Sequence, residues 1–242
     1  PRAPSDRCSM PGIPGATRVV DAIAPLIVSA SRSTDIPAFY GDWFMNRLAA
    51  GYVRWKSPFG GNDLWVSFAQ TRVFVFWSKN PAPFLPFLPA LDKRKYLYYF
   101  LFTLNDYHAE HLEPNVPSLD ERIGTFIRLS RALGKGRVVW RFDPLILSVR
   151  LAVPDLLERI GAIGDRIASF TERMIFSFAD ISKYPKVGRN LKAGGFAGAR
   201  EFTAGEAEEF CTGLAALNRD WGLSVTACAE GRDLSRFGIG RG

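Results

Sequence analysis

Arginine and aspartate stand near the end of the stretch RVVWRFDPL, residues 137–145, whose other residues are apolar enough for a buried strand. Side chains alternate along a strand, so Arg141 and Asp143 project to one side and Trp140 to the other, while Pro144 is expected to stop the strand. A guanidinium binds anionic groups, and a carboxylate accepts hydrogen bonds from amines or hydroxyl groups. The pair therefore indicates either a ligand contact or a salt bridge that closes the strand end.

Polar or ionisable residues follow all six strands that the sequence predicts. The strands are expected near 25–31, 73–77, 97–103, 137–142, 173–178 and 223–228. Because the carboxyl ends of parallel strands meet at one face of an α/β protein, these residues predict a pocket for a small-molecule or anionic ligand. The candidate ligand-binding residues are Arg32, Asp35, Lys79, Asn80, Arg141, Asp143, Asp180 and Glu230.

Each of these residues also has a purely structural interpretation. Polar residues follow a strand wherever the chain reaches solvent. In SRSTDIP, residues 31–37, Thr34 or Asp35 is expected to cap the helix that begins near Pro37, which leaves Arg32 as the better candidate for anion binding. His108 and His111 are expected to lie in an exposed loop, because two ligands do not complete a metal site.

The predicted strands alternate with helical patterns, which is typical of parallel βα units. Helices are expected near 37–49, 81–91, 118–133, 153–168 and 204–221, and Ser118 and Glu121 form a capping-box pattern at the start of the third. We predict an α/β fold, a TIM-like (partial) parallel β/α barrel of about six βα units with an inserted hairpin near 51–68. Residues 1–24 are expected to form a loose N-terminal arm, and residues 25–242 a single domain.

The composition narrows the class of protein. The formal net charge of +7 suits an anionic partner such as nucleic acid, without locating a site. The three cysteines, Cys8, Cys211 and Cys228, are too widely spaced for a metal knuckle and too few for a disulfide scaffold, which favours a reducing, cytoplasmic compartment. We find no membrane segment, P-loop, dinucleotide fingerprint or nucleophile elbow. The sequence gives no oligomeric state.

Several motifs resemble an uncharacterised bacterial family catalogued as domain of unknown function 1848. They are SASRSTDIPAFYGDWFMNRLAAGYV (29–53), VFWSKNPAPFLPFL (75–88), YYFLFTLNDY (98–107), LEPNVPS (112–118), VVWRFDPLIL (138–147), RNLK (189–192) and TACAE (226–230). The resemblance implies a TIM-like barrel related to radical S-adenosylmethionine enzymes and, distantly, to spore photoproduct lyase. It thereby implies S-adenosylmethionine and a [4Fe–4S] cluster as cofactors.

The chain departs from this family pattern in two places. Family members typically continue past the segment similar to DLSRFGIGRG (233–242) into a C-x-x-x-C-x-x-C motif, and this chain stops before it. No cofactor can therefore be assigned from the chain's own cysteines. Ser33 stands where a second arginine often follows Arg32, which weakens an anion site there.

Three functions remain open at this point. The leading one is the barrel portion of a radical-S-adenosylmethionine-type enzyme whose strand-end pocket binds S-adenosylmethionine, substrate or both. In it, Arg32, Lys79 and Arg141 hold anionic groups, Asn80 positions the ligand, and the carboxylates accept hydrogen bonds. The alternatives are a non-catalytic binding protein for nucleic acid or another anionic ligand, and a metal-dependent barrel hydrolase using at least three of Asp143, Asp180, Glu230 and the histidines.

Overall fold

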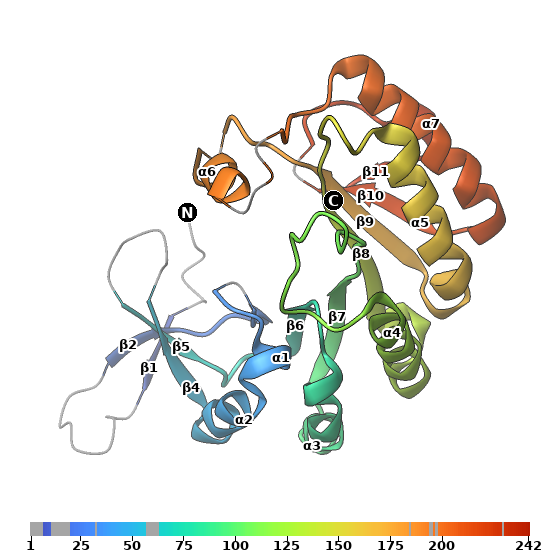
Figure 1. The fold of residues 1–242 in the computed structure, drawn as a ribbon. Coiled ribbons are helices and arrows are strands. Elements are labelled where there is room, and N and C mark those ends of the chain that lie inside the picture. Colours follow the sequence, from blue (N-terminus) through green and yellow to red (C-terminus); the bar gives the residue numbers. More distant parts are fainter. Residues whose placement is uncertain are drawn as a thin grey trace. The chain divides into compact units, whose positions relative to one another are not determined.

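A computed structural model describes residues 7–10, 20–31, 33–56, 63–183, 185–193, 196, 198–228 and 230–242. The chain divides into two compact units, unit 1 with residues 1–100 and unit 2 with residues 101–242 (Figure 1). The fold is α/β, with a seven-stranded, all-parallel sheet whose strands alternate with helices. The strand order is β11-β10-β9-β8-β7-β6-β3, so consecutive strands of this sheet are neighbours. The described strands include no pair between β3 and β11 that would close a barrel.

Six of the seven strands match the predicted ones closely. The seven strands are β3 (Ile27–Ser29), β6 (Val73–Ser78), β7 (Leu97–Thr103), β8 (Val138–Leu145), β9 (Arg173–Phe178), β10 (Ser224–Ala227) and β11 (Gly240–Arg241). Runs of β-branched and aromatic residues identified the first six. Strand β11 was not predicted; it has only two residues and pairs with Thr226 and Ala227 of β10.

Unit 1 also contains a second sheet, with strand order β1-β2-β5-β4. Its strands are β1 (Arg7–Met10), β2 (Val20–Ile23), β4 (Tyr52–Trp55) and β5 (Leu64–Ser67). The antiparallel pair β4–β5 confirms the hairpin predicted near 51–68, although its turn at 57–62 lies outside the described residues. Strands β1 and β2 pair antiparallel and were not predicted.

Helices α1 (Ile36–Phe39), α2 (Gly41–Ala50) and α3 (Leu88–Lys93) belong to unit 1. The expectation of a single helix near 37–49 is wrong, because Tyr40, whose φ is −133°, separates α1 from α2. The helix expected near 81–91 is a 3₁₀ segment, Ala82–Phe87, followed by α3. Prolines at 83, 86 and 89 remove backbone donors that a continuous α-helix needs. The core of unit 1 is rich in aromatic side chains. The ring centroids of Phe44 and Phe74, for example, are 5.3 Å apart.

Helices α4 (Leu119–Leu133), α5 (Val153–Ile167), α6 (Pro185–Ala193) and α7 (Ala204–Trp221) belong to unit 2. The predicted capping box of α4 is confirmed, since Ser118 Oγ accepts from the Glu121 N–H at 3.3 Å and the Glu121 carboxylate accepts from the Ser118 N–H at 3.0 Å. Figure 1 shows α5 and α7 lying side by side beside β8, β9 and β10. Helix α6 was not predicted from the sequence.

Strand β8 continues through Pro144 to Leu145, so the expectation that Pro144 stops the strand is wrong. The Asp143–Pro144 peptide bond is cis. Against β9 the pairing shifts register between Phe142 and Leu145, which accommodates a residue that has no N–H to donate. The strand consequently places Asp143 and Pro144 at the carboxyl end of the central strand of the sheet.

Candidate functional site

A buried amide and a buried phenol fix the end of β8. The Asn105 side chain, 1% exposed, accepts from the Asp143 N–H at 2.9 Å and donates to the Asp143 carbonyl at 3.1 Å. The Tyr107 hydroxyl donates to the Pro144 carbonyl at 2.7 Å and accepts from the Ile146 N–H at 3.2 Å. Burial raises the pKa of Tyr107, which keeps the hydroxyl protonated as a donor. These four bonds replace the sheet hydrogen bonds that the backbone lacks around Pro144.

The Asp143 carboxylate joins β8 to β9. Its Oδ2 pairs with the Arg141 guanidinium, and its Oδ1 accepts from the Ser177 hydroxyl at 2.6 Å. The Arg141 and Asp143 side chains are 9% and 16% exposed, and burial lowers the pKa of Arg141. Of the two interpretations that the sequence left open for this pair, the salt bridge is confirmed. The Asp143 carboxylate, held by Arg141, in turn orients the hydroxyl of Ser177, a residue that lines a cavity at this end of the sheet.

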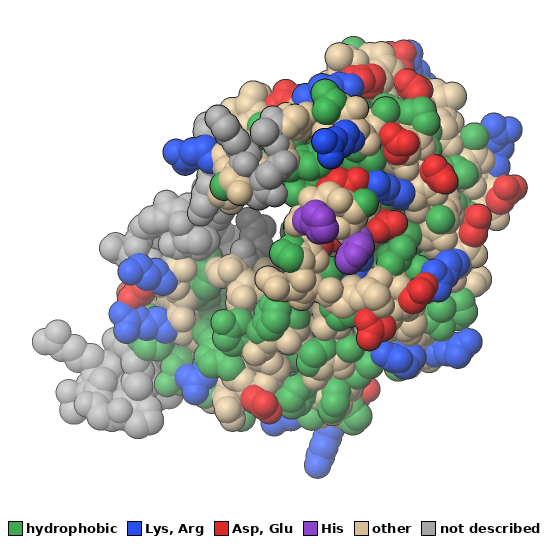
Figure 2. All heavy atoms as spheres, viewed as in Figure 1, with side chains coloured by type: hydrophobic (Ala, Val, Ile, Leu, Met, Phe, Trp, Pro, Cys, Tyr) green, Lys and Arg blue, Asp and Glu red, His purple; other side chains and the backbone are tan. Residues whose placement is uncertain are grey.

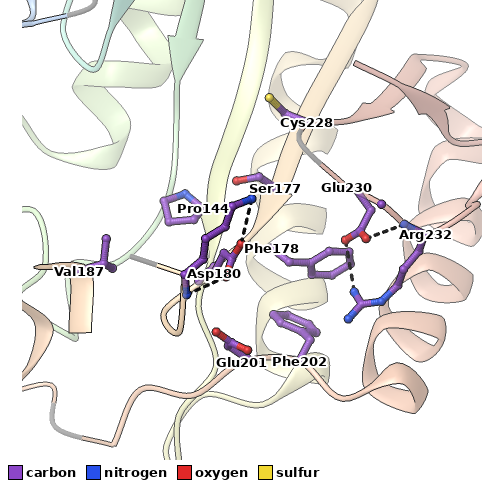
Figure 3. A pocket seen from close by; sticks show the side chains of 13 residues that line it. Pro144, Ser177, Phe178, Asp180, Val187, Glu201, Phe202, Cys228, Glu230 and Arg232 are labelled. Carbon is purple, nitrogen blue, oxygen red and sulfur yellow. Dashed lines mark hydrogen bonds and ion pairs between the residues drawn. The ribbon is translucent and has the colours of Figure 1, made fainter. Parts of the chain in front are cut away.

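A cavity of about 530 Å³ opens beyond the carboxyl ends of β8, β9 and β10 in unit 2 (Figure 3). Strand ends of parallel sheets are where α/β proteins bind ligands. Two predicted site residues, Asp180 and Glu230, are part of its wall. The cavity is lined by Pro144, Ser177, Phe178, Ala179, Asp180, Lys183, Val187, Glu201, Phe202, Cys228, Glu230, Gly231 and Arg232.

Two of the cavity carboxylates pair with cations from their own loops. Asp180 lies 3.7 Å from Lys183 Nζ and also accepts from the Lys183 backbone N–H at 3.2 Å. Glu230 Oε2 lies 3.2 Å from Arg232 Nη1, and its Oε1 accepts from the Arg232 N–H at 2.8 Å. In both pairs the cation is more exposed than the carboxylate. Each carboxylate also accepts a backbone hydrogen bond, so it is held more firmly in place than the side chain of the cation with which it pairs.

The third carboxylate, Glu201, accepts from the Ser182 N–H at 2.6 Å, and this bond is the main reason that its pKa is lowered. Phe178 and Phe202 form the apolar wall, with ring centroids 4.7 Å apart. The lining thus combines three carboxylates, two cations and two aromatic rings. Such a surface can hold a polar molecule that carries a positive group and a flat or apolar part.

Three predicted site residues come together in unit 1 and hold backbone in place. Asp35 Oδ1 accepts from the Ala38 N–H at 3.1 Å, which confirms the capping prediction, and its Oδ2 accepts from the Lys79 N–H at 2.8 Å. Burial raises the pKa of Asp35. Asn80 Oδ1 accepts from the Ala82 N–H at 3.3 Å, which shapes the turn after β6. A ligand role for Asp35, Lys79 and Asn80 stays a prediction, and Arg32 lies outside the described residues.

Several lining residues were not among the predicted site residues. Ser177 and Phe178 are the last two residues of a predicted strand, and this position at the carboxyl end of the strand is the signal that identifies them. Cys228 also ends a predicted strand, but it was interpreted as a buried, inert thiol, whereas it is partly exposed and free. Glu201 and Phe202 come from an irregular segment whose path no periodic pattern indicates.

The described residues do not fit an iron–sulfur cluster or another metal centre. Cys211 is fully buried in α7, where burial raises its pKa to about 11, and Cys228 lies at the end of β10. No group of three His, Cys, Asp or Glu side chains within the described ranges is arranged to hold a metal ion. His108 and His111 are exposed in a turn, as predicted, and Figure 2 shows the histidine side chains at the surface.

Comparison with known proteins identifies the family but no function. No curated protein and no solved structure matches the sequence. None of the helices in the described part of the chain has the length and apolar character needed to cross a bilayer. The family model described as domain of unknown function (DUF1848) matches residues 27–242, which is most of the chain. The chain therefore belongs to the DUF1848 family.

Proposed function

We propose that unit 2 binds a small polar molecule in the strand-end cavity, and that this molecule is S-adenosylmethionine or a substrate of similar chemistry. The observation that carries the proposal is the lining itself, in which Asp180, Glu201 and Glu230 face the same cavity as Phe178 and Phe202. S-Adenosylmethionine has the complementary groups, namely an ammonium and a sulfonium, two ribose hydroxyl groups and a flat adenine ring. A cavity of about 530 Å³ lies within the range of small-molecule sites.

The proposal follows what the resemblance to the DUF1848 family implies, namely a TIM-like barrel related to radical S-adenosylmethionine enzymes. A parallel sheet whose consecutive strands are neighbours is the arrangement from which such a barrel is built, and that supports this assignment. The chemistry that a [4Fe–4S] cluster supplies in such enzymes has no ligand set among the described residues. The proposal is accordingly one of ligand binding by the residues of this chain.

Isothermal titration of the protein with S-adenosylmethionine tests the proposal. We expect saturable binding with one site, weakened at least about ten-fold by Glu230→Gln, because a largely buried carboxylate contacting a cation contributes more than 1 kcal/mol. Glu208→Gln is the matched control, since Glu208 is exposed, pairs with Arg236 and does not line the cavity. Absence of binding, or equal loss in both variants, would contradict the proposal.

Charge distribution favours a second candidate, single-stranded nucleic acid bound by unit 1. Residues 1–100 carry 12 basic and 6 acidic side chains, whereas residues 101–242 carry 19 and 18. Phe39, Tyr40 and Trp43 of unit 1 are 70%, 47% and 45% exposed and offer faces on which bases stack. Binding of an oligothymidylate that falls steeply with salt and is lost in Trp43→Ala is expected; salt-independent or absent binding excludes this candidate.

A metal-dependent hydrolase receives no support from the described donors. Asp143 is bound to Arg141 and Ser177, while Asp180 and Glu230 pair with cations, and no three-donor group forms within the described residues.

A further inference from the structure

Arg232 occupies a position in the cavity that suits the positive group of a ligand. Its Nη1 lies 3.2 Å from Glu230 Oε2, and its Cζ lies 5.5 Å from the centroid of the Phe178 ring (Figure 3). A carboxylate beside an aromatic face is the arrangement that binds sulfonium, ammonium and guanidinium ions, through charge attraction and the negative face of the ring. In this structure the chain's own guanidinium fills that arrangement.

The two sides of this contact differ in how firmly they are held. The Glu230 side chain is 14% exposed, whereas the Arg232 side chain is 42% exposed. Phe178 is fixed by neighbouring rings, with centroids 5.5 Å from Phe176 and 5.9 Å from Phe210. An exposed ion pair of this kind contributes little, because water screens it and the long arginine side chain loses freedom in forming it. The carboxylate and the ring are thus fixed, and the guanidinium is replaceable.

We propose that Glu230 and Phe178 form a cation subsite, and that Arg232 leaves it when the positive group of a ligand enters. Because the subsite is one wall of the same cavity, the inference rests on the proposed function and narrows its substrate class to molecules with a sulfonium, ammonium or guanidinium group. Arg232 acts as a competitor for that position. Its removal strengthens the binding of a cationic ligand, whereas removal of an arginine that holds an anion weakens binding.

A second arginine in the same segment provides a matched control. Arg236 pairs with Glu208, and its Cζ lies 4.8 Å from the centroid of the Phe237 ring, so it makes the same two kinds of contact. It does not line the cavity. Arg232→Gln and Arg236→Gln therefore remove the same charge from similar surroundings, and only the first opens the proposed subsite.

The test is isothermal titration of the wild-type protein and both variants with S-adenosylmethionine and with S-adenosylhomocysteine, which lacks the methyl group and the sulfonium charge. We expect Arg232→Gln to bind S-adenosylmethionine about three- to five-fold more tightly than the wild-type protein, the factor gained when an exposed ion pair no longer competes. For S-adenosylhomocysteine, which keeps the ammonium, the same gain places the ammonium in the subsite, and an affinity within about two-fold of the wild-type value places the sulfonium there. Both affinities of Arg236→Gln should stay within about two-fold of the wild-type values. Arg232→Met, which keeps the apolar length of the side chain, should show the same gain.

Two results separate the failure of this inference from that of the proposed function. If S-adenosylmethionine binds the wild-type protein but Arg232→Gln and Arg232→Met bind it equally or more weakly, the subsite is wrong and the proposed function stands. If neither compound binds the wild-type protein or any variant, both are wrong. An equal gain in Arg236→Gln would also overturn the subsite, because it would show a general effect of net charge.

Discussion

At the scale of residues, the candidate site depends on a few side chains that hold one piece of backbone. The Asn105 and Tyr107 side chains make four hydrogen bonds to the backbone of residues 143–146. Asp143 then connects Arg141 to Ser177, and Ser177 faces the cavity. These side chains therefore hold Pro144 and Ser177, which line the cavity.

Asn105→Ala is expected to lower the free energy of unfolding by about 1–3 kcal/mol, because it removes a buried side chain and leaves the N–H and carbonyl of Asp143 without their partner. Urea denaturation measures the loss. Asn190→Ala, at an exposed position of α6, is the control and should change the stability by less than about 0.5 kcal/mol. Equal stability of Asn105→Ala and the wild-type protein would show that the hydrogen bonds from Asn105 to the backbone of Asp143 do not stabilise the fold.

The sequence located some of these residues and missed others for a physical reason. Asp180 and Glu230 were predicted because each follows a strand that the pattern of apolar residues marks clearly. Arg232, Glu201 and Phe202 reach the same cavity from irregular loops, and their paths depend on contacts made after folding. Asp35 and Asn80 satisfied the same strand-end rule and bind backbone N–H groups in unit 1.

At the scale of elements, helices α5 and α7 pack closely against each other, and α7 also contacts β8 of the parallel sheet. A Cβ atom at Gly164 of α5 would lie 2.2 Å from Cζ2 of Trp221, whereas one at Gly161 would lie 3.6 Å from the nearest atom of Leu217. The Trp221 ring also packs on Trp140 of β8, with centroids 5.9 Å apart. Because Gly164 has no side chain, the Trp221 ring of α7 can pack both against α5 and against Trp140 of β8.

Gly164→Ala is expected to lower the free energy of unfolding by about 1–3 kcal/mol, because the rigid indole must move away from a well-packed interface. Gly161→Ala, one turn earlier on the same helix, should leave the stability unchanged or raise it by up to about 1 kcal/mol, since alanine favours the helix and meets only ordinary contacts. Urea denaturation of both variants makes the comparison. A stabilised Gly164→Ala would contradict the packing described for Trp221.

The start of α7 gives a prediction about pH. Arg200 is the main reason that the pKa of Glu206 is lowered to about 2, and the capping bonds from Thr203 add to the effect. A carboxylate whose pKa is lower in the folded protein stabilises the fold above its unfolded pKa, near 4.5, and loses this contribution as the pH falls toward 2.

Glu206→Gln should therefore be less stable than the wild-type protein at pH 7, and the difference should shrink between pH 4.5 and pH 2. Urea midpoints at several pH values measure this. Glu209→Gln, at an exposed carboxylate of the same helix, should show a much smaller difference at pH 7. A difference for Glu206→Gln that stays constant down to pH 2 would refute the role given to this carboxylate.

Regular elements were predicted more accurately than their ends and interruptions. The ranges 97–103 and 173–178 match β7 and β9, because each is a continuous run of strand-forming residues. The 3₁₀ segment at Ala82–Phe87 was missed although Pro83 and Pro86 argue against a continuous α-helix there. The break at Tyr40 was missed because it depends on local backbone geometry that apolar spacing does not encode. The course of β8 past Pro144 depends on Asn105 and Tyr107, which are distant in sequence.

At the scale of the whole molecule, the two units differ in charge and in what they offer a ligand. Most of the excess positive charge lies in residues 1–100, while the cavity lies in residues 101–242, where basic and acidic side chains nearly balance. The sequence indicated the parallel α/β class from the alternation of strands and helices. It did not indicate the division at residue 100, because β7 runs through that point as one uninterrupted apolar strand.

The most direct test of the proposed binding site is a crystal structure of the protein with S-adenosylmethionine. We predict ligand density in the cavity beyond β8, β9 and β10, with the positive group beside Glu230 and Phe178 and the Arg232 side chain displaced into solvent. Ligand density elsewhere on the molecule, or an empty cavity at a saturating concentration of S-adenosylmethionine, would contradict the proposal.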